Sequence, residues 1–152
     1  MQQDKSSKRL YLEDLSVGME FISREHRLDA EQIISFASQF DPQPFHISAE
    51  SAQHSFFNGL AASGWHTMAI TMRLIVECVP LAQGVIGVGG ELSWPRPTRP
   101  EDIMHVKCTV IDIKPSKSKP DRAIVLLHGI TYNQAGDILQ DFTGKLLVFN
   151  KS

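Results

Sequence analysis

The segment from residue 63 to residue 79 contains no proline, and its apolar residues fall on nearly every face of the helix that it predicts. A helix that is apolar on most sides must be covered by other structure. From residue 85 onward the pattern changes to β-forming runs that turn signals separate. The expected strands are residues 85–94, 103–113, 122–133 and 138–149. The chain therefore predicts one long helix wrapped by a sheet.

A fifth strand is expected at residues 19–28, where apolar and polar residues partly alternate. Most connections between the strands have hairpin length, which favours an antiparallel sheet. These elements predict an α+β fold, with a curved sheet of about five strands around one central helix. The chain of 152 residues is long enough for one domain. We expect this domain to span residues 11–152, after a flexible N-terminal lead of residues 1–10.

Two shorter helices are expected between the first strand and the central helix. Asp29 is the expected N-cap of the first, and Gln32 follows it at capping-box spacing. Apolar residues then recur at helical spacing, so this helix should end by delivering Asp41 just before Pro42. The second helix is expected at residues 48–57, with a serine as its cap.

Composition and charge exclude several classes of protein. The formal net charge of −2 at pH 7 argues against non-specific binding to nucleic acid. The polar N-terminus does not predict a signal peptide, and polar residues interrupt the longest apolar region, residues 65–81, so it fails as a membrane span. Cys78 and Cys108 lack the spacing of a zinc site or of a disulfide scaffold and are expected to be buried thiols. We therefore expect a cytoplasmic protein that binds no metal, nucleic acid or membrane.

Asp41 and His46 are separated by two prolines, a glutamine and a phenylalanine. Each proline fixes its own φ and disfavours helix for the residue before it, so a stiff loop is expected. A carboxylate and an imidazole on a stiff loop are a candidate acid/base pair, because proton transfer requires both groups to stay within reach of one water or substrate atom. A structural role is the alternative, in which Asp41 caps a turn and His46 packs at its end.

The Asp-Pro-Gln-Pro-Phe-His loop is one of several segments that resemble a known family. The others are Leu-Glu-Asp-Leu-Ser-Val-Gly at 12–18, Phe-Asn-Gly at 57–59, Ser-Gly at 63–64 and Arg-Pro-Thr-Arg-Pro-Glu-Asp at 96–102. In order and spacing they resemble the motifs of the MaoC-like dehydratases, or (R)-specific enoyl-CoA hydratases. That family has an Asp-x-Asn-Pro-x-His loop, a Phe-Gly segment, a small residue before Gly at the central helix, and an Arg-Pro-Val-x-Pro-Gly-Asp pattern. The resemblance extends from residue 11 to residue 149.

This resemblance implies a hot-dog fold, in which a long helix lies in a curved antiparallel sheet, and a hydro-lyase activity. It implies that Asp41 and His46 activate water for addition to a 2-enoyl thioester, or remove water from an (R)-3-hydroxyacyl thioester. The backbone N–H of Gly64, at the start of the central helix, would stabilise the thioester oxygen. The substrate would be an acyl-CoA, with coenzyme A as part of the substrate and no further cofactor. The protein would be a homodimer or a higher homo-oligomer, with its site near the subunit interface.

The chain departs from the family pattern at positions that bear on the substrate. Gln43 replaces the family's Asn, so the hydrogen bond of that side chain must be re-aimed. Ser63 precedes Gly64, and the bulky Trp65 follows, where it is expected to narrow or redirect the acyl pocket. Ser63, Trp65 and Gln43 therefore join Gly64 as expected substrate-binding residues. An ordinary helix cap with close packing is the alternative for the Ser-Gly pair.

Two other functions remain open on the sequence. Other hot-dog proteins are thioesterases that direct water at the thioester carbonyl, and a non-catalytic domain could keep the fold and only bind acyl thioesters. The presence of both Asp41 and His46 favours the hydratase, because a pure binding domain needs neither group. The basic loop at residues 114–122 is either a solvated hairpin or a contact for coenzyme A phosphates. His66 is either a packed core residue or a neighbour of the thioester.

Overall fold

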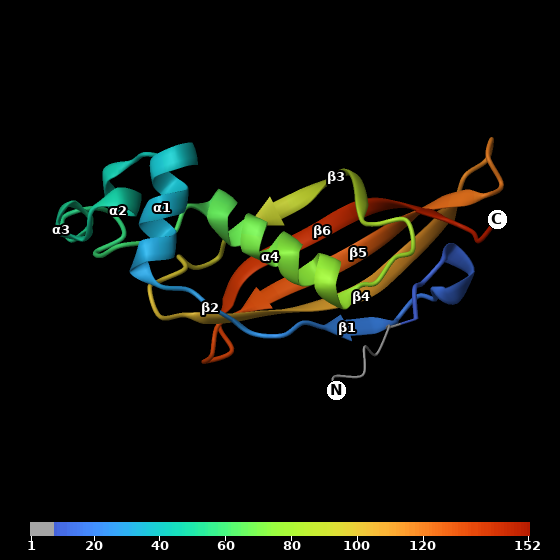
Figure 1. Cartoon of the computed structure of the whole chain (residues 1–152), viewed down its shortest axis with the longest axis horizontal. Helices are drawn as coiled ribbons and strands as arrows, with labels where there is room; N and C mark the ends of the chain where they lie inside the picture. Colours follow the sequence, from blue (N-terminus) through green and yellow to red (C-terminus); the bar gives the residue numbers. More distant parts are fainter. Residues whose placement is uncertain (1–7) are drawn as a thin grey trace, which may run out of the picture.

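The computed structural model describes residues 8–152 as an antiparallel sheet with one long helix across it (Figure 1). The six strands have the order β1-β4-β5-β6-β3, and the short β2 also pairs with β4. They are β1 (Glu20–Ile22), β2 (His26–Arg27), β3 (Ile86–Ser93), β4 (Ile103–Pro115), β5 (Arg122–Tyr132) and β6 (Ile138–Phe149). The expected α+β class and hot-dog architecture are confirmed, and β3 to β6 begin and end within two residues of the expected strands.

The central helix α4 (Gly64–Cys78) lies along one face of the sheet (Figure 1). Its buried side chains recur at helical spacing and are His66, Thr67, Ile70, Thr71, Leu74 and Ile75. The other flank is open, since the side chains of Trp65 and Val76 are 61% and 51% exposed. The expectation of a helix covered on most sides is therefore wrong for this flank within a single chain. An apolar strip of α4 faces solvent.

The core lies between α4 and the inner face of the sheet. Along β5, and along β4 as far as Val110, every second side chain is buried, which is the alternation of a strand with one covered face. The largest fully buried apolar side chains are Leu28, Ile33, Leu74, Ile75, Met104, Leu139, Val106, Val110 and Val125. Cys108 is buried as expected, whereas Cys78, at the end of α4, is only partly buried, and both are free thiols.

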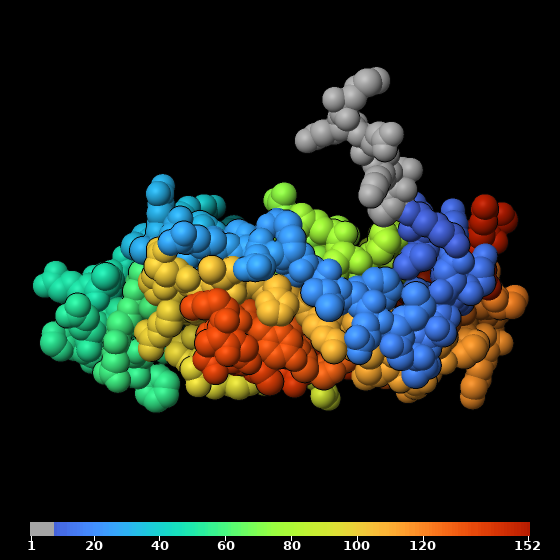
Figure 2. All heavy atoms as spheres, turned by 90° about the horizontal axis from the view of Figure 1, so that it is seen from below, coloured from blue at the N-terminus to red at the C-terminus, as the bar shows by residue number. Residues whose placement is uncertain are grey.

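The expected strand at residues 19–28 is divided into two short strands, so the sheet has six strands rather than about five. The division lies at Ser23, whose hydroxyl accepts the N–H of Val106 at 2.9 Å in place of a backbone carbonyl. This side chain interrupts the ladder between β1 and β2. Figure 2 shows the segment in blue, running along the edge of the sheet beside β4.

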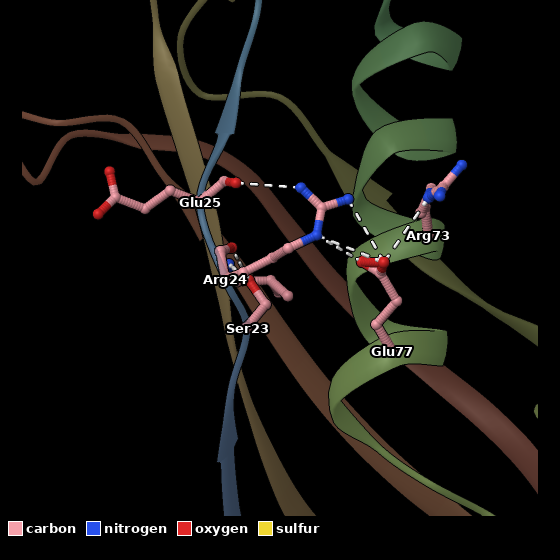
Figure 3. Close-up of polar contacts among 6 residues, drawn as sticks. Ser23, Arg24, Glu25, Arg73 and Glu77 are labelled. Carbon is pink, nitrogen blue, oxygen red and sulfur yellow. Dashed lines mark hydrogen bonds and ion pairs between the residues drawn. The ribbon is translucent and has the colours of Figure 1, made fainter. Parts of the chain in front are cut away.

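An ionic contact joins the interruption to the central helix. Arg24 lies between β1 and β2 and donates to Glu77 of α4, with Nε 2.8 Å from Oε1 (Figure 3). Arg73, one helical turn before Glu77, approaches the same carboxylate at 3.7 Å. The two guanidinium groups, Arg24 first, lower the pKa of Glu77. The short edge strands are thus tied to α4 as well as to β4.

Three helices gather at one end of the sheet: α1 (Ala30–Phe40), α2 (Pro44–Ile47) and α3 (Ala49–Ala52) (Figure 1). Asp29 caps α1 as expected by accepting the N–H of Gln32 at 2.9 Å. The capping box is not completed, because the Gln32 side-chain oxygen, which would accept the Asp29 N–H, lies 2.7 Å from His26 Nε2 instead.

The expected helix at residues 48–57 ends after one turn. The carbonyl of Ala52 accepts hydrogen bonds from the Ser55 hydroxyl at 2.6 Å and from the N–H of Gly59 at 2.9 Å. Asn58 follows with a positive φ of 51°. These bonds turn the chain away from the helix axis and form an irregular loop before α4.

Residues 1–7 of the expected flexible lead lie outside the described residues. Leu10, at the end of that lead, pairs with Leu81, and its N–H donates to the carbonyl of Pro80 at 2.8 Å. Leu10 therefore belongs to the domain. A short 3-10 helix (Leu12–Asp14) follows it. Within residues 8–152, no helix has the length and apolar character needed to cross a membrane.

Candidate active site

A cavity of about 510 Å³ lies where α2, the first turn of α4 and the segment after β3 meet. Asp41 and His46 line it together with Gly64 and Trp65, so four of the residues singled out by the sequence share one cavity. The remaining wall is largely aromatic and proline-rich, from Phe56, Phe57, Trp94, Pro95 and Pro97. An apolar cavity with a few polar groups is the usual form of a small-molecule site.

Asp41 and His46 are brought together by the end of one helix and the start of another. Asp41 is the residue after α1, with φ −153° and ψ 65°, and Pro42 follows it. The sequence predicted that His46 lies on a stiff loop. It lies instead in the single turn of α2, which Pro44 begins. This turn directs the ring back to α1, so that His46 Nε2 lies 3.4 Å from Asp41 Oδ2.

The orientation of the His46 ring follows from its other nitrogen. Nδ1 lies 2.6 Å from the carbonyl oxygen of Ala61, which can only accept, so Nδ1 carries a proton. In the neutral imidazole Nε2 is then an acceptor directed at the cavity and at Asp41. The side chain is only 6% exposed. His46 is thus held in one tautomer and one orientation.

Asp41 is held as a carboxylate. Burial pushes its pKa upward, but the neighbouring Ser63, the amide of Gln43 and the positive charge that the His46 ring carries when protonated together hold the pKa below its ordinary value. Gln43 Nε2 donates to Oδ1 at 2.6 Å, which is how this chain uses the longer side chain. Gln43 lies beside the carboxylate and does not line the cavity. Asp41 is therefore ionised at neutral pH.

Ser63 is the N-cap residue of α4 and is fully buried. Its hydroxyl lies near the Asp41 carboxylate and helps to lower the pKa of that group. Within residues 8–152, however, the hydroxyl oxygen has no partner at hydrogen-bond geometry. The side chain does not cap the helix either. Ser63 therefore lies behind the cavity wall, with a free donor close to the carboxylate.

The first turn of α4 presents free backbone donors. The N–H groups of Gly64 and Trp65 have no acceptor within the described part of the chain. Unpaired N–H groups at a helix N-terminus carry a partial positive charge and stabilise negative charge beside them. Because Gly64 lines the cavity that holds Asp41 and His46, an oxyanion can be stabilised next to the acid/base pair.

Trp94 explains structurally why residue 64 is glycine. A Cβ atom at Gly64 would lie 2.7 Å from the indole carbons of Trp94, far inside van der Waals contact. The indole is held in place by its N–H, which donates to the buried amide of Gln140 at 2.9 Å. Trp65 meets the same indole edge to face, with ring centroids 5.7 Å apart. The two tryptophans and Gly64 thus form one packed wall.

The floor of the cavity carries two hydroxyls. Thr67 of α4 and Thr98, from the segment after β3, are both buried and hydrogen-bond each other at 2.9 Å. Both line the cavity. This bond uses one of the two hydroxyl protons, so a ligand that reaches these side chains meets a second hydroxyl whose proton the pair does not use.

Sequence reasoning did not identify Trp94, Phe57 or Thr98 as site residues. Thr98 lies inside the proline-rich motif at residues 96–102, and Trp94 comes just before it. The available signal was the cluster of prolines directly after a strand, because prolines fix the backbone and keep such a segment in one conformation beside the sheet. Only the packing of this segment against α4 shows which of its side chains line the cavity.

Two features left open by the sequence lie away from this cavity. His66 stacks on Phe36 with ring centroids 4.5 Å apart and borders a separate pocket of about 230 Å³. Burial is the main cause that lowers the pKa of His66 to about 4, so the ring is neutral at pH 7. The basic loop at residues 114–122 joins β4 to β5 at the opposite end of the domain (Figure 1). Within one chain, that loop does not reach the cavity.

Comparison with known proteins adds a family and several relatives. The sequence matches the family described as "MaoC like domain" over residues 15–128. It is 32% identical over 143 residues to "Uncharacterized protein YdeM" of Bacillus subtilis, covering 92% of this chain and 98% of that protein. It is 27% identical over 111 residues to "3-hydroxybutyryl-CoA dehydratase" of Methylorubrum extorquens, covering 72% and 69%. The crystal structure of a MaoC-like dehydratase from Rhodospirillum rubrum is similar with a TM-score of 0.93 at 59% identity, covering 94% of this chain and 99% of that chain.

Proposed function

Because the chain belongs to the MaoC-like dehydratase family, we propose that it adds water to a 2-enoyl thioester of coenzyme A, or removes water from the (R)-3-hydroxyacyl thioester. The family supports a hydratase or dehydratase activity, and the thioester substrate is our proposal. One observation carries it: Asp41 Oδ2 and His46 Nε2 lie 3.4 Å apart at the wall of a cavity that also exposes Gly64.

The pair is suited to hold a water molecule. With the His46 proton on Nδ1, both Nε2 and the ionised Asp41 carboxylate are acceptors, so one water can donate an O–H to each. As the water oxygen attacks C3 of the enoyl group, one acceptor takes a proton from the water. The same acceptor then gives that proton to C2, so that the hydroxyl and the proton of one water are added across the double bond and the acceptor returns to its starting state.

The thioester oxygen gains negative charge during this step. Electrons of the double bond move toward the carbonyl as the C3–O bond forms, and the enolate-like oxygen requires a donor. The free N–H groups of Gly64 and Trp65 supply it at the positive end of α4. Since these donors belong to the backbone, they are in place before the substrate arrives and need no rearrangement during the reaction.

The assay that tests the proposal uses crotonyl-CoA, whose conjugated double bond absorbs light and loses that absorbance on hydration. Free thiol is measured in the same samples with a thiol reagent. Loss of absorbance without thiol release supports the hydratase. Thiol release would instead indicate a thioesterase, and binding without either change would indicate a non-catalytic acyl-thioester domain.

Trp65 is expected to control acyl chain length rather than the chemistry. Its side chain lines the cavity and is 61% exposed, so removing the indole enlarges the cavity and leaves the acid/base pair in place. Trp65→Ala should therefore shift kcat/KM toward longer enoyl chains by about tenfold relative to crotonyl-CoA, as apolar pocket contacts allow.

A kinetic series over enoyl thioesters of increasing chain length measures this shift. Ile111→Ala is the matched control, because Ile111 is an exposed apolar residue of β4 and does not line the cavity. An unchanged chain-length profile in Trp65→Ala would show that Trp65 does not contribute to acyl selection.

We further propose that two copies pair through β3 into one continuous sheet. Within the described chain β3 pairs only with β6, which leaves its other edge with unpaired backbone groups. The strand is exposed along most of its length, including Val88 at 55%. It runs directly into Trp94 at the cavity wall, so a partner on β3 lies beside the cavity mouth. The exposed apolar flank of α4, which includes Trp65 and Val76, is also available for burial by a partner.

Light scattering at micromolar concentration should therefore give a mass near twice 17.0 kDa. Val88→Lys places a charge on the pairing edge and should shift the mass toward 17.0 kDa. Ile111→Lys, on β4, which pairs with strands on both sides and lies far from β3 in the sheet order, should keep the dimer. A wild-type monomer with full turnover would contradict the pairing and the shared site.

A further inference from the structure

Arg99 lies in the connection between β3 and β4 and directs its guanidinium at the loop before α4. Its Nη1 donates to the carbonyl of Gly59 at 2.9 Å and of Leu60 at 3.3 Å, and its Nη2 donates to the carbonyl of Phe57. One side chain therefore satisfies three carbonyl oxygens of a loop that has no helix or strand. Only a planar guanidinium offers this many donors in fixed directions.

The loop needs such a support. Phe56 at its tip is 92% exposed, and Asn58 and Gly59 both have positive φ, at 51° and 140°. The φ of Gly59 lies in a region that side chains rarely adopt, so glycine is required at this bend beside Arg99. Arg99 is itself fixed by its backbone N–H, which donates to the Asp102 carboxylate at 2.8 Å.

The supported loop carries two contacts of His46. The Phe57 ring packs on the imidazole, with centroids 5.9 Å apart. Ala61, directly after the last carbonyl that Arg99 holds, accepts the Nδ1 proton of His46 at 2.6 Å. The first contact limits the position of the ring, and the second sets its tautomer.

We propose that Arg99 is a positioning residue for the hydration reaction, acting through the loop at residues 57–61 to hold the His46 ring with Nε2 toward Asp41. The inference rests on the proposed function for its kinetic part. Loss of the guanidinium frees three carbonyls and lets Ala61 move relative to the ring. His46 then samples orientations in which Nε2 no longer faces Asp41, and a displacement of about 1 Å at a reacting group lowers rates by roughly a hundredfold.

The test compares Arg99→Ala, Arg99→Lys and the control Arg27→Ala. Arg27 is an exposed arginine whose side chain, among residues 8–152, pairs with Glu101 alone and does not line the cavity. Nitrogen NMR of the imidazole reports the tautomer and the exchange protection of His46 Nδ1–H without substrate. Kinetics with crotonyl-CoA report kcat and KM, with and without added guanidinium ion.

Arg99→Ala should lose the protected Nδ1–H signal and lower kcat roughly tenfold to a hundredfold with KM nearly unchanged, and guanidinium should restore part of kcat. Arg99→Lys keeps the positive charge but loses the planar set of guanidinium donors, so its kcat and its Nδ1–H protection should lie between those of wild type and Arg99→Ala. This variant also serves as the test if the alanine variant is unstable. Arg27→Ala should match wild type in both measurements.

A normal His46 signal and normal kcat in a folded Arg99 variant would overturn the proposal. Absence of hydration by the wild-type protein would instead refute the proposed function, while the NMR comparison would still decide the role of Arg99.

Discussion

Asp41→Asn and His46→Ala are each expected to lower the rate of crotonyl-CoA hydration by a factor on the order of a hundred or more. Asparagine keeps the shape of Asp41 but removes the charge and offers an N–H where the water must donate. Alanine at residue 46 removes the acceptor Nε2, 3.4 Å from the carboxylate. Stopped assays of enoyl absorbance measure the loss, and circular dichroism checks that the fold survives.

The chain offers a matched control for this experiment. His128 and Asp141 form a second imidazole–carboxylate pair at 2.8 Å, on β5 and β6 and outside the cavity. Asp141→Asn and His128→Ala remove the same chemical groups, and we expect their hydration rates to stay near wild type. Near-normal turnover in both Asp41→Asn and His46→Ala, with folded protein, would refute the proposed mechanism.

Gly64→Val is expected to lower hydration by about a hundredfold to a thousandfold, the usual effect of losing an oxyanion donor. A side chain at residue 64 blocks close approach of a thioester to the first N–H groups of α4. The same side chain also meets the indole of Trp94, because even its Cβ lies 2.7 Å from that ring. The single variant alone cannot separate these two effects.

The double variant Gly64→Val with Trp94→Ala separates them. Removing the indole makes room for the valine, so recovery of activity would show that glycine is needed only to accommodate Trp94. We expect the double variant to remain as slow as Gly64→Val, because the valine still covers the backbone donors. Trp94→Ala alone, which removes the donor to Gln140 but leaves the N–H groups accessible, should retain most of the hydration rate.

The elements of the fold could be expected from local patterns. Strands β4 and β5 alternate strongly, turn signals separate β3 to β6, and α1 begins directly after its cap Asp29 and ends before Pro42. The failures lie where a side chain competes with the backbone. Ser23 takes a ladder N–H and divides the first strand, and Ser55 takes a helix carbonyl and ends α3. Such competition depends on where the partner strand or loop lies, so periodicity does not reveal it.

The candidate site was only partly accessible to the same reasoning. Asp41 and His46 are five residues apart between prolines, and their chemistry could be recognised from residue type and spacing. The short helix that turns His46 toward Asp41 was not expected, nor was the carbonyl of Ala61 that fixes its tautomer. The wall formed by Trp94 joins segments about thirty residues apart in the chain, since Gly64 begins α4 and Trp94 follows β3.

By itself the sequence determined the fold class, the order of the elements and the position of a candidate acid/base pair, because these depend on the periodicity of apolar residues and on chemically distinctive side chains close together in the chain. The tertiary structure alone decided which nitrogen of His46 faces Asp41, why residue 64 must be glycine, and how Arg99 reaches the loop at residues 57–61. These features depend on contacts between distant segments, whose distances and directions are set only when the helices pack on the sheet.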